Sequence, residues 1–259
     1  MVSGGQRRQG PHARAPAGGL ADLKYGAPAL HLARPAGWWR SAASLAAKDL
    51  RVGLRRREMA AGVLVFSLLV ALTFAFAFDP ARLDGRRLMP GALWVTVLFS
   101  GMLAVSRTMA AEQEHGTLAA LLASPVGPEA LFFGKMAGAL AWVALVELVA
   151  APVLAALLRV TVDRPALLAG VLALGSVGFV GAATLVAAVS LQARGGEVLM
   201  PVLLVPLAVP ATLAAVEAMG AVLQGEGAGA LGVWVRVLVA YDVLMVALPP
   251  ALFRFLWEG

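Results

Sequence analysis

The chain has 259 residues, of which 60% are hydrophobic and 14% charged, and its mean hydropathy is +0.83. Because soluble domains carry about 25% charged residues, this composition excludes a soluble globular protein and indicates one that crosses a membrane several times. The net charge of +6 arises from residues 1–58, which hold eleven Lys and Arg against three Asp and Glu, and the sequence contains no Cys to form disulfides or thiolate sites.

The first 38 residues are rich in Gly, Pro, Ala and Arg, and we expect them to form a low-complexity extension without a fold of its own. From residue 39 to residue 58 apolar and basic side chains alternate, which predicts an amphipathic helix lying on the membrane against anionic lipid. A plain basic linker is the alternative. No pattern typical of nucleic-acid binding accompanies the basic charge. The residues expected to anchor this interfacial helix are Trp38, Trp39, Lys48, Asp49 and Arg51.

Six apolar stretches follow, each long enough for one bilayer crossing of about 20 residues. The predicted spans are residues 59–78, 88–106, 136–158, 166–191, 198–220 and 233–253. The sequence therefore predicts an all-α polytopic protein with a single transmembrane domain over residues 59–257. The basic N-terminal segment predicts that both termini lie in the cytoplasm, although the loop at residues 79–87 departs locally from the positive-inside rule.

A polar segment interrupts the apolar sequence between the second and third spans. Its acidic residues Glu112 and Glu114 favour a helix start, because carboxylates are stabilised at helix N-termini. A patch of leucines follows, and the Ser124–Pro125 step ends the helix, since the residue before proline disfavours helical geometry. We therefore predict a short cytosolic helix within the loop 107–135. Its apolar patch consists of Leu118, Leu121 and Leu122.

Two features within the spans have functional and purely structural interpretations. Glu147 lies near the middle of the third span, where an ionisable group is costly, so it either lines a proton or ion path or forms a helix contact. The fifth span contains Pro201, Pro206 and Pro210, each of which removes a backbone donor. This span is either a bending element or a static helix that tolerates the prolines.

The residues needed for common active sites are missing from the sequence. No stretch has the spacing of a nucleotide-binding P-loop, because six residues separate Gly127 from Gly134 and Met136 follows the lysine. The three histidines, His12, His31 and His115, lie outside the predicted spans, so no histidine is available there to ligate haem or to activate a serine. We expect no catalytic, metal or cofactor site in this chain.

Four segments in a fixed order resemble the CcmB family, the membrane subunits of the ABC-type system for cytochrome c maturation. They are KDLRVGLRRRE (48–58), LMPGALWVTVLFSGMLAVSRTMAAEQEHGTLAALLASPV (88–126), RGGEVLMPVLLVPLAVPATLAAVEAM (194–219) and AYDVLMVALPPALFRFL (240–256). The resemblance covers residues 39–257. It implies an ABC-2-like permease of the bacterial inner membrane that couples ATP hydrolysis on a CcmA-like ATPase subunit to release of haem-loaded chaperone, beside a CcmC-like haem-handling subunit.

The resemblance also implies that the leucine patch of the 107–135 loop docks on the ATPase, although the patch could instead pack on its own membrane domain. The tryptophan-rich haem motif of the haem-handling subunit is absent, because Arg40 follows Trp38 and Trp39. Haem would then belong to another subunit and ATP to the ATPase. Two other functions stay open at this point: an ABC-2-type exporter of a drug, lipid or polysaccharide, and a proton- or ion-coupled transporter that uses Glu147.

Overall fold

The computed structural model describes residues 37–55, 57–78, 84–114, 128–192 and 196–258. The described residues form seven helices, and the prediction of an all-α fold is confirmed. The helices are α1 (Trp38–Arg55), α2 (Arg57–Ala77), α3 (Gly85–Glu114), α5 (Pro128–Leu157), α6 (Pro165–Gln192), α7 (Gly196–Gln224) and α8 (Ala228–Glu258).

Six of these helices, α2 to α8, are long and apolar enough to cross a bilayer, as the sequence predicts. The candidate spans are Ala60–Ala77, Gly85–Arg107, Glu129–Leu157, Pro165–Ser190, Val198–Gln224 and Ala228–Pro249. The predicted boundaries differ most at the third span, which begins at residue 129 rather than 136. In the sequence, Lys135 suggests the polar end of a span. In the structure α5 begins at Pro128, and the Lys135 side chain is buried within it.

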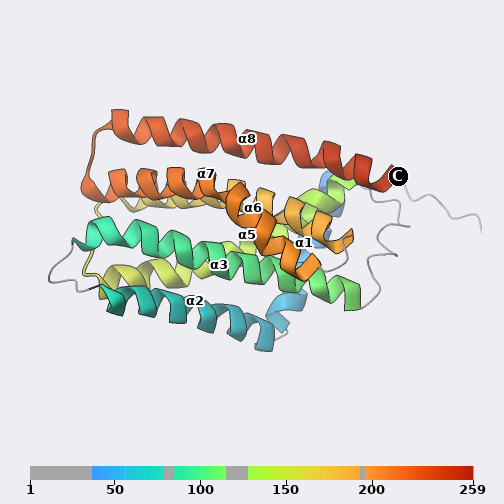
Figure 1. The fold of residues 1–259 in the computed structure, drawn as a ribbon, viewed down its shortest axis with the longest axis horizontal. Helices are drawn as coiled ribbons and strands as arrows, with labels where there is room; N and C mark the ends of the chain where they lie inside the picture. The colour runs from blue at the N-terminus through green and yellow to red at the C-terminus, as the bar shows by residue number, and fades with distance from the viewer. Residues whose placement is uncertain (1–36, 56, 79–83, 115–127, 193–195, 259) are drawn as a thin grey trace, which may run out of the picture. The chain divides into compact units, whose positions relative to one another are not determined.

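Consecutive long helices run in alternating directions (Figure 1). The starts of α2, α5 and α7 and the ends of α3, α6 and α8 therefore gather at one end, where α1 also lies. We call this the α1 end, and the other the opposite end. The end of α3 at Glu114 and the start of α5 at Pro128 therefore both lie at the α1 end.

Local sequence explains several helix boundaries. Proline is the first residue of both α5 and α6, where its missing N–H leaves no hydrogen bond unmade. Before α3, the Asp84 carboxylate accepts a hydrogen bond of 3.0 Å from the Arg86 backbone N–H. After α7, Gly225 has a φ of 70° and Glu226 N–H donates to the Ala221 carbonyl at 2.9 Å, which ends the helix in a left-handed turn.

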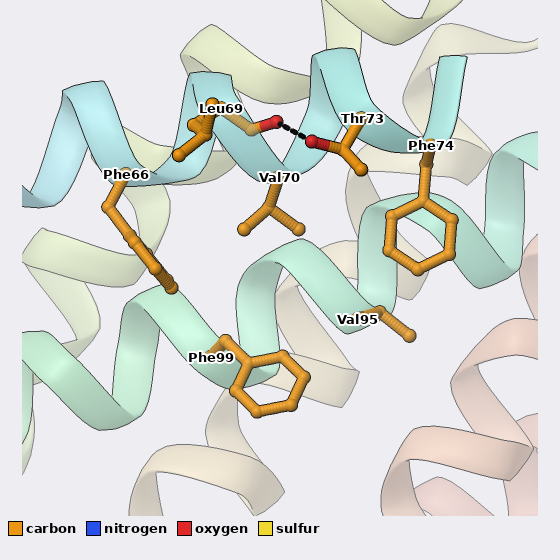
Figure 2. A pocket seen from close by; sticks show the side chains of 7 residues that line it. All are labelled: Phe66, Leu69, Val70, Thr73, Phe74, Val95 and Phe99. Carbon is orange, nitrogen blue, oxygen red and sulfur yellow. Dashed lines mark hydrogen bonds between the residues drawn. The ribbon is translucent and has the colours of Figure 1, made fainter. Parts of the chain in front are cut away.

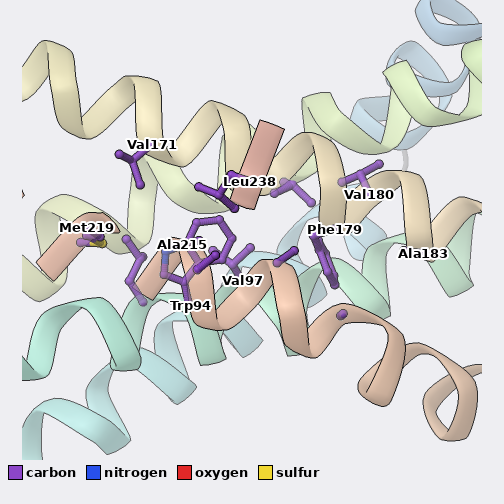
Figure 3. Close-up of a cluster of buried hydrophobic side chains, with 14 of the residues drawn as sticks. Trp94, Val97, Val171, Phe179, Val180, Ala183, Ala215, Met219 and Leu238 are labelled. Carbon is purple, nitrogen blue, oxygen red and sulfur yellow. The ribbon is translucent and has the colours of Figure 1, made fainter. Parts of the chain in front are cut away.

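The buried core takes side chains from all six long helices. The part labelled in Figure 3 lies where α3, α6, α7 and α8 meet. Trp94 of α3 is 2% exposed and packs against Gly175 of α6, where an added Cβ would overlap the indole ring. Helices in lipid associate by close packing rather than by hydrophobicity, so a small residue opposite a large one is an expected solution. The labelled core residues of Figure 3 include Val97, Val171, Phe179, Val180, Ala183, Ala215, Met219 and Leu238.

Five hydroxyl side chains within the spans bond to carbonyls of their own helices. Thr73 donates to the Leu69 carbonyl at 2.7 Å, and Thr96 donates to the Ala92 carbonyl at 2.8 Å. The same bond to a carbonyl three or four residues earlier recurs at Ser67, Ser106 and Thr212. These groups satisfy their hydrogen-bonding needs locally, as apolar surroundings require.

Candidate functional site

Helix α1 presents two different faces at the α1 end. Its buried stripe contains Ala42, Asp49 and Gly53, whereas Lys48 and Arg51 are exposed. Trp39 is also exposed, and the Arg40 guanidinium lies 5.0 Å from its ring centroid. The amphipathic pattern predicted for residues 39–58 therefore appears in a helix of 18 residues, with Asp49 on its buried face rather than among the exposed anchors.

The buried stripe of α1 packs on the first half of α5. The Lys135 ammonium of α5 lies 2.9 Å from Asp49 Oδ2, and the two side chains are 7% and 8% exposed. Lys48 reaches the other carboxylate oxygen, Oδ1, at 3.5 Å from the solvent side. Both oxygens of Asp49 therefore have a cationic partner, which is what a buried carboxylate needs.

The structure changes one prediction for the polar segment. Glu112 and Glu114 do not begin a separate helix, because α3 continues to Glu114 and the two residues form its last turn. The residues from Ser106 to Glu114 include Met, Ala, Gln and Glu, which favour helix, and no Gly or Pro interrupts them. The remaining residues predicted for ATPase coupling, Leu118, Leu121, Leu122, Ser124 and Pro125, lie outside the described residues.

The middle of the bundle contains a carboxyl group in a helix contact. Glu147 of α5 is 8% exposed, and its Oε1 accepts a hydrogen bond of 2.5 Å from the Ser176 hydroxyl of α6. On the other side of α6, Asp242 and Tyr241 of α8 pack closely against Gly178, and Tyr241 donates to the Leu207 carbonyl of α7 at 2.6 Å. These polar side chains thus connect α6 to α5 and α8.

All three prolines of the fifth span lie inside α7, which remains one helix from Gly196 to Gln224. Pro206 and Pro210 are exposed together with apolar neighbours. The freed carbonyls therefore do not break the helix, and α7 changes direction along its length (Figure 1).

An apolar groove lies between α2 and α3, with a volume of about 360 Å³ (Figure 2). Four of its lining residues are Phe66, Leu69, Val95 and Phe99. The hydroxyl of Thr73, which also lines the groove, points to the Leu69 carbonyl of its own helix (Figure 2). An occupant of the groove would therefore meet an apolar surface, and none of the side chains that line the groove could ligate haem iron.

At the opposite end, Arg86 of α3 bonds to α7 and to the loop between α5 and α6. Its Nη1 donates to the Leu223 carbonyl near the end of α7 at 2.9 Å, and its Nη2 donates to Thr161 at 2.8 Å and to Asp163 at 3.2 Å. A cation beside the last carbonyls of a helix interacts favourably with its dipole. Arg86 and Arg87, which the sequence places in the loop at residues 79–87, lie in the first turn of α3, and Arg87 is 3.9 Å from Asp84.

The described part of the chain contains no group of three or more His, Cys, Asp or Glu side chains placed to hold a metal ion. The ion pair and hydrogen bonds described above join neighbouring helices or stand at helix ends.

Comparison with known proteins then identifies the family. Residues 40–254 match the CcmB protein family. The chain belongs to the CcmB family. The match includes α2, α3, α5, α6 and α7 in full and nearly all of α1 and α8. The resemblance drawn from the four sequence segments is confirmed.

Curated CcmB relatives carry the name heme exporter protein B. The protein of Bradyrhizobium diazoefficiens is 36% identical over 190 residues, which cover 70% of this chain and 82% of the relative. That of Rhodobacter capsulatus is 29% identical over 209 residues, covering 80% of this chain and 94% of the relative. That of Paracoccus denitrificans is 31% identical over 183 residues, covering 68% and 81%.

Sequence reasoning missed the partners of the buried charges. It assigned Asp49 to a membrane-facing helix and Lys135 to a loop, whereas the two form one ion pair. A usable signal was present, because Gly134 and Gly138 flank Lys135 with the four-residue spacing that lets helices approach closely. Ser176 as the partner of Glu147 had no comparable signal, since serines in spans commonly bond to their own backbone.

Proposed function

We propose that this chain is the membrane-spanning subunit of the ABC-type complex of cytochrome c maturation, the role implied by CcmB membership. The observation that carries this proposal is the family match over residues 40–254, which reaches all six candidate spans. The relatives' name, heme exporter protein B, points to the same process. The chain is a non-catalytic permease subunit, and ATP hydrolysis belongs to a partner chain of the CcmA kind.

The α1 end is the side proposed to meet the ATPase. Helix α3 ends and α5 begins there, and the two helices pack against each other in the core. A force applied to the connection between α3 and α5 would therefore reach two helices of the core at once. We propose that Leu118, Leu121 and Leu122 dock in a groove of the ATPase, as an apolar helix face does in helix-in-groove recognition.

The orientation proposed for the chain has both termini in the cytoplasm. Exposed Lys48, Arg51 and Arg55 of α1 support this, because cationic residues are enriched at the cytoplasmic face. The arginines at the opposite end weigh less against it, since Arg86 is engaged by Asp163, Thr161 and the Leu223 carbonyl. In this orientation the exposed face of α1 meets anionic lipid of the inner membrane.

Haem is assigned to a neighbouring CcmC-like subunit and not to this chain. None of the six candidate spans contains His or Cys, the commonest axial ligands of haem proteins. In this proposal the present chain changes shape when ATP is hydrolysed, and the haem-handling subunit responds to that change. The chain therefore needs specific helix contacts rather than a cofactor site.

Co-expression with the ATPase subunit tests the proposal. We expect the ATPase to co-purify with this chain in mild detergent, and Leu118→Asp or Leu121→Asp to abolish co-purification while the chain still inserts in the membrane. Leu118→Met and Leu121→Met are matched controls that keep the apolar surface and should retain the ATPase. If the wild-type chain captures no ATPase, the proposed function is wrong. If the wild-type chain captures the ATPase and the Asp variants capture it equally well, the docking surface lies elsewhere.

A further inference from the structure

The contact between α1 and α5 is built for close approach. Gly134 faces Ala42 and Leu45, and a Cβ added at Gly134 would lie 2.8 Å from Leu45 Cβ and 3.1 Å from the Ala42 carbonyl. One turn later Gly138 faces Asp49, with 3.3 Å between an added Cβ and Asp49 Cβ. Two glycines four residues apart on α5 thus receive the buried stripe of α1.

Further along the same contact, the glycine is on α1 and the large side chain is on α5. Gly53 of α1 lies against the Trp142 indole, at 2.5 Å from an added Cβ to the ring. Contacts therefore advance in the same direction along both chains, from Ala42 with Gly134 to Gly53 with Trp142. The two helices follow each other in parallel through this region, which we call the α1–α5 seam.

The ion pair between Asp49 and Lys135 lies inside this seam. Glycines allow two helices to approach, but they carry no side chain that sets which turn of one helix faces which turn of the other. A buried charge pair does set this register, because displacement by one turn would separate the Lys135 ammonium from the Asp49 carboxylate in an apolar setting. The 2.9 Å contact therefore fixes the sliding position of α1 on α5.

The order of the helices along the chain means that the register of α1 on α5 also links α5 to α2. Helix α1 ends at Arg55 and α2 begins at Arg57, so only one residue separates them. Lys135 is within the first turns of α5, which starts at Pro128. The start of α5 is thereby joined to the start of α2 through α1, although α2 and α5 are separated in sequence by the whole of α3.

We propose that the Asp49–Lys135 pair joins α1 to the first turns of α5 as one rigid unit, which carries a displacement of the start of α5 into α2. The proposal rests on the function proposed above, in which a partner ATPase acts at the α1 end. Lys135 and Asp49 are positioning residues in this scheme. The unit moves as a whole during the ATP cycle, and the α1–α5 seam stays closed.

The first test measures whether the α1–α5 seam opens, by disulfide crosslinking. The chain has no cysteine of its own, so the only thiols are those introduced. Leu45→Cys with Gly134→Cys places two thiols across the seam. On the present backbone the two Cβ atoms would lie 2.8 Å apart, which is closer than the Cβ separation of about 3.8 Å that disulfides prefer, so the two helices must separate slightly to hold the bridge. In the purified complex with its ATPase, we expect equal rates of oxidative crosslinking without nucleotide and with ATP trapped by vanadate. A rate that drops severalfold in one of the two states shows that the seam opens and overturns the proposal.

The second test separates positioning from mere folding. Lys135→Met keeps the length of the side chain and removes its charge, while Lys135→Arg keeps the charge. We expect Lys135→Met to retain the ATPase and its ATP turnover but to reduce the yield of c-type cytochrome, measured by covalent haem staining, about tenfold, within the usual range for coupling between sites. Lys135→Arg should restore most of this yield.

The outcomes also distinguish this inference from the function on which it rests. A wild-type chain that captures no ATPase refutes the proposed function. A complex that forms normally and matures cytochromes equally well with Lys135→Met refutes the rigid unit alone. Should Lys135→Met lower the amount of chain in the membrane, the crosslinking rates in the Leu45→Cys, Gly134→Cys protein still decide, because that protein keeps the ion pair.

Discussion

The two ends of the bundle hold their helices together in different ways. At the α1 end, Asp49 and Lys135 form an ion pair whose side chains are 8% and 7% exposed, in a seam lined by glycine. At the opposite end, Arg86 is 35% exposed and distributes its bonds over a backbone carbonyl, a hydroxyl and a carboxylate. Removing one partner of a buried pair leaves the other charge without a counterion and without water, which strongly lowers stability. In an exposed cluster, water can replace the lost bonds.

The largest effect is expected from Asp49→Ala, which leaves the Lys135 ammonium buried without its carboxylate. Breaking a buried pair costs about 3–5 kcal/mol, since the remaining charge stays desolvated. We expect a clearly lower midpoint of thermal unfolding in detergent. The double variant Asp49→Ala, Lys135→Met removes both charges and should recover most of the loss. Equal midpoints for the wild type and Asp49→Ala would show that solvent reaches this pair.

A somewhat smaller loss is expected when the glycine seam is filled. Gly134→Val places a branched side chain against Leu45 and the Ala42 backbone, and overpacking of this kind costs about 1–3 kcal/mol. Gly170→Ala is the matched control, because nothing lies within 4 Å of an added Cβ there. Alanine favours helix over glycine by up to about 1 kcal/mol, so the control should unfold at an equal or higher temperature. A Gly134→Val protein as stable as the control would contradict the close approach.

A modest effect is expected at the opposite end. Arg86→Ala removes hydrogen bonds to Leu223, Thr161 and Asp163, but water has access to the site, so we estimate a loss of about 1 kcal/mol. Arg87→Ala serves as the control, since its side chain is 76% exposed and lies 3.9 Å from Asp84, a surface pair of small value. Thermal unfolding of the two variants in parallel checks the order. If Arg86→Ala were as harmful as Asp49→Ala, the two ends would not differ in the way described.

The smallest effect is expected between the two ends, at Glu147. Glu147→Gln keeps a carbonyl oxygen that can accept the Ser176 hydroxyl, so the α5–α6 contact should persist and the loss should stay below the value of about 1 kcal/mol expected for Arg86→Ala. We expect cytochrome c maturation to continue at the wild-type level. Glu147→Leu, which has no acceptor, is the comparison variant for the contact. Loss of maturation with Glu147→Gln at unchanged stability would instead support a proton- or ion-coupled role for this carboxyl.

Several elements of the fold follow directly from composition along the chain. The six spans are visible because about 20 consecutive apolar residues have few alternatives to crossing a bilayer. The helix over Trp38–Arg55 is visible because its basic and apolar residues alternate with a helical period. These features depend on single segments, which is why one sequence suffices to predict them.

The contacts between segments were harder to predict. Asp49 and Lys135 are 86 residues apart. The glycines beside Lys135 indicate a close helix contact there, but they do not indicate which helix makes it. Asp49 lies between exposed cations in the sequence, so its burial becomes apparent only when α5 is placed beside α1. The start of α5 was misjudged for the same reason, because a lysine within a span is unexpected until its counterion is known. The helix start predicted at Glu112 failed because α3 is longer than one bilayer crossing.

Five serine and threonine residues of the spans bear on whether the interior of the bundle could hold water. Hydroxyls of Ser67, Thr73, Thr96, Ser106 and Thr212 are each turned back to a carbonyl of their own helix. Such residues add polarity to the sequence without adding wet surface to the protein. The presence of these five hydroxyls in the spans is therefore no evidence for a water-filled passage. Replacing any of them with alanine should leave no donor on a neighbouring helix without its acceptor.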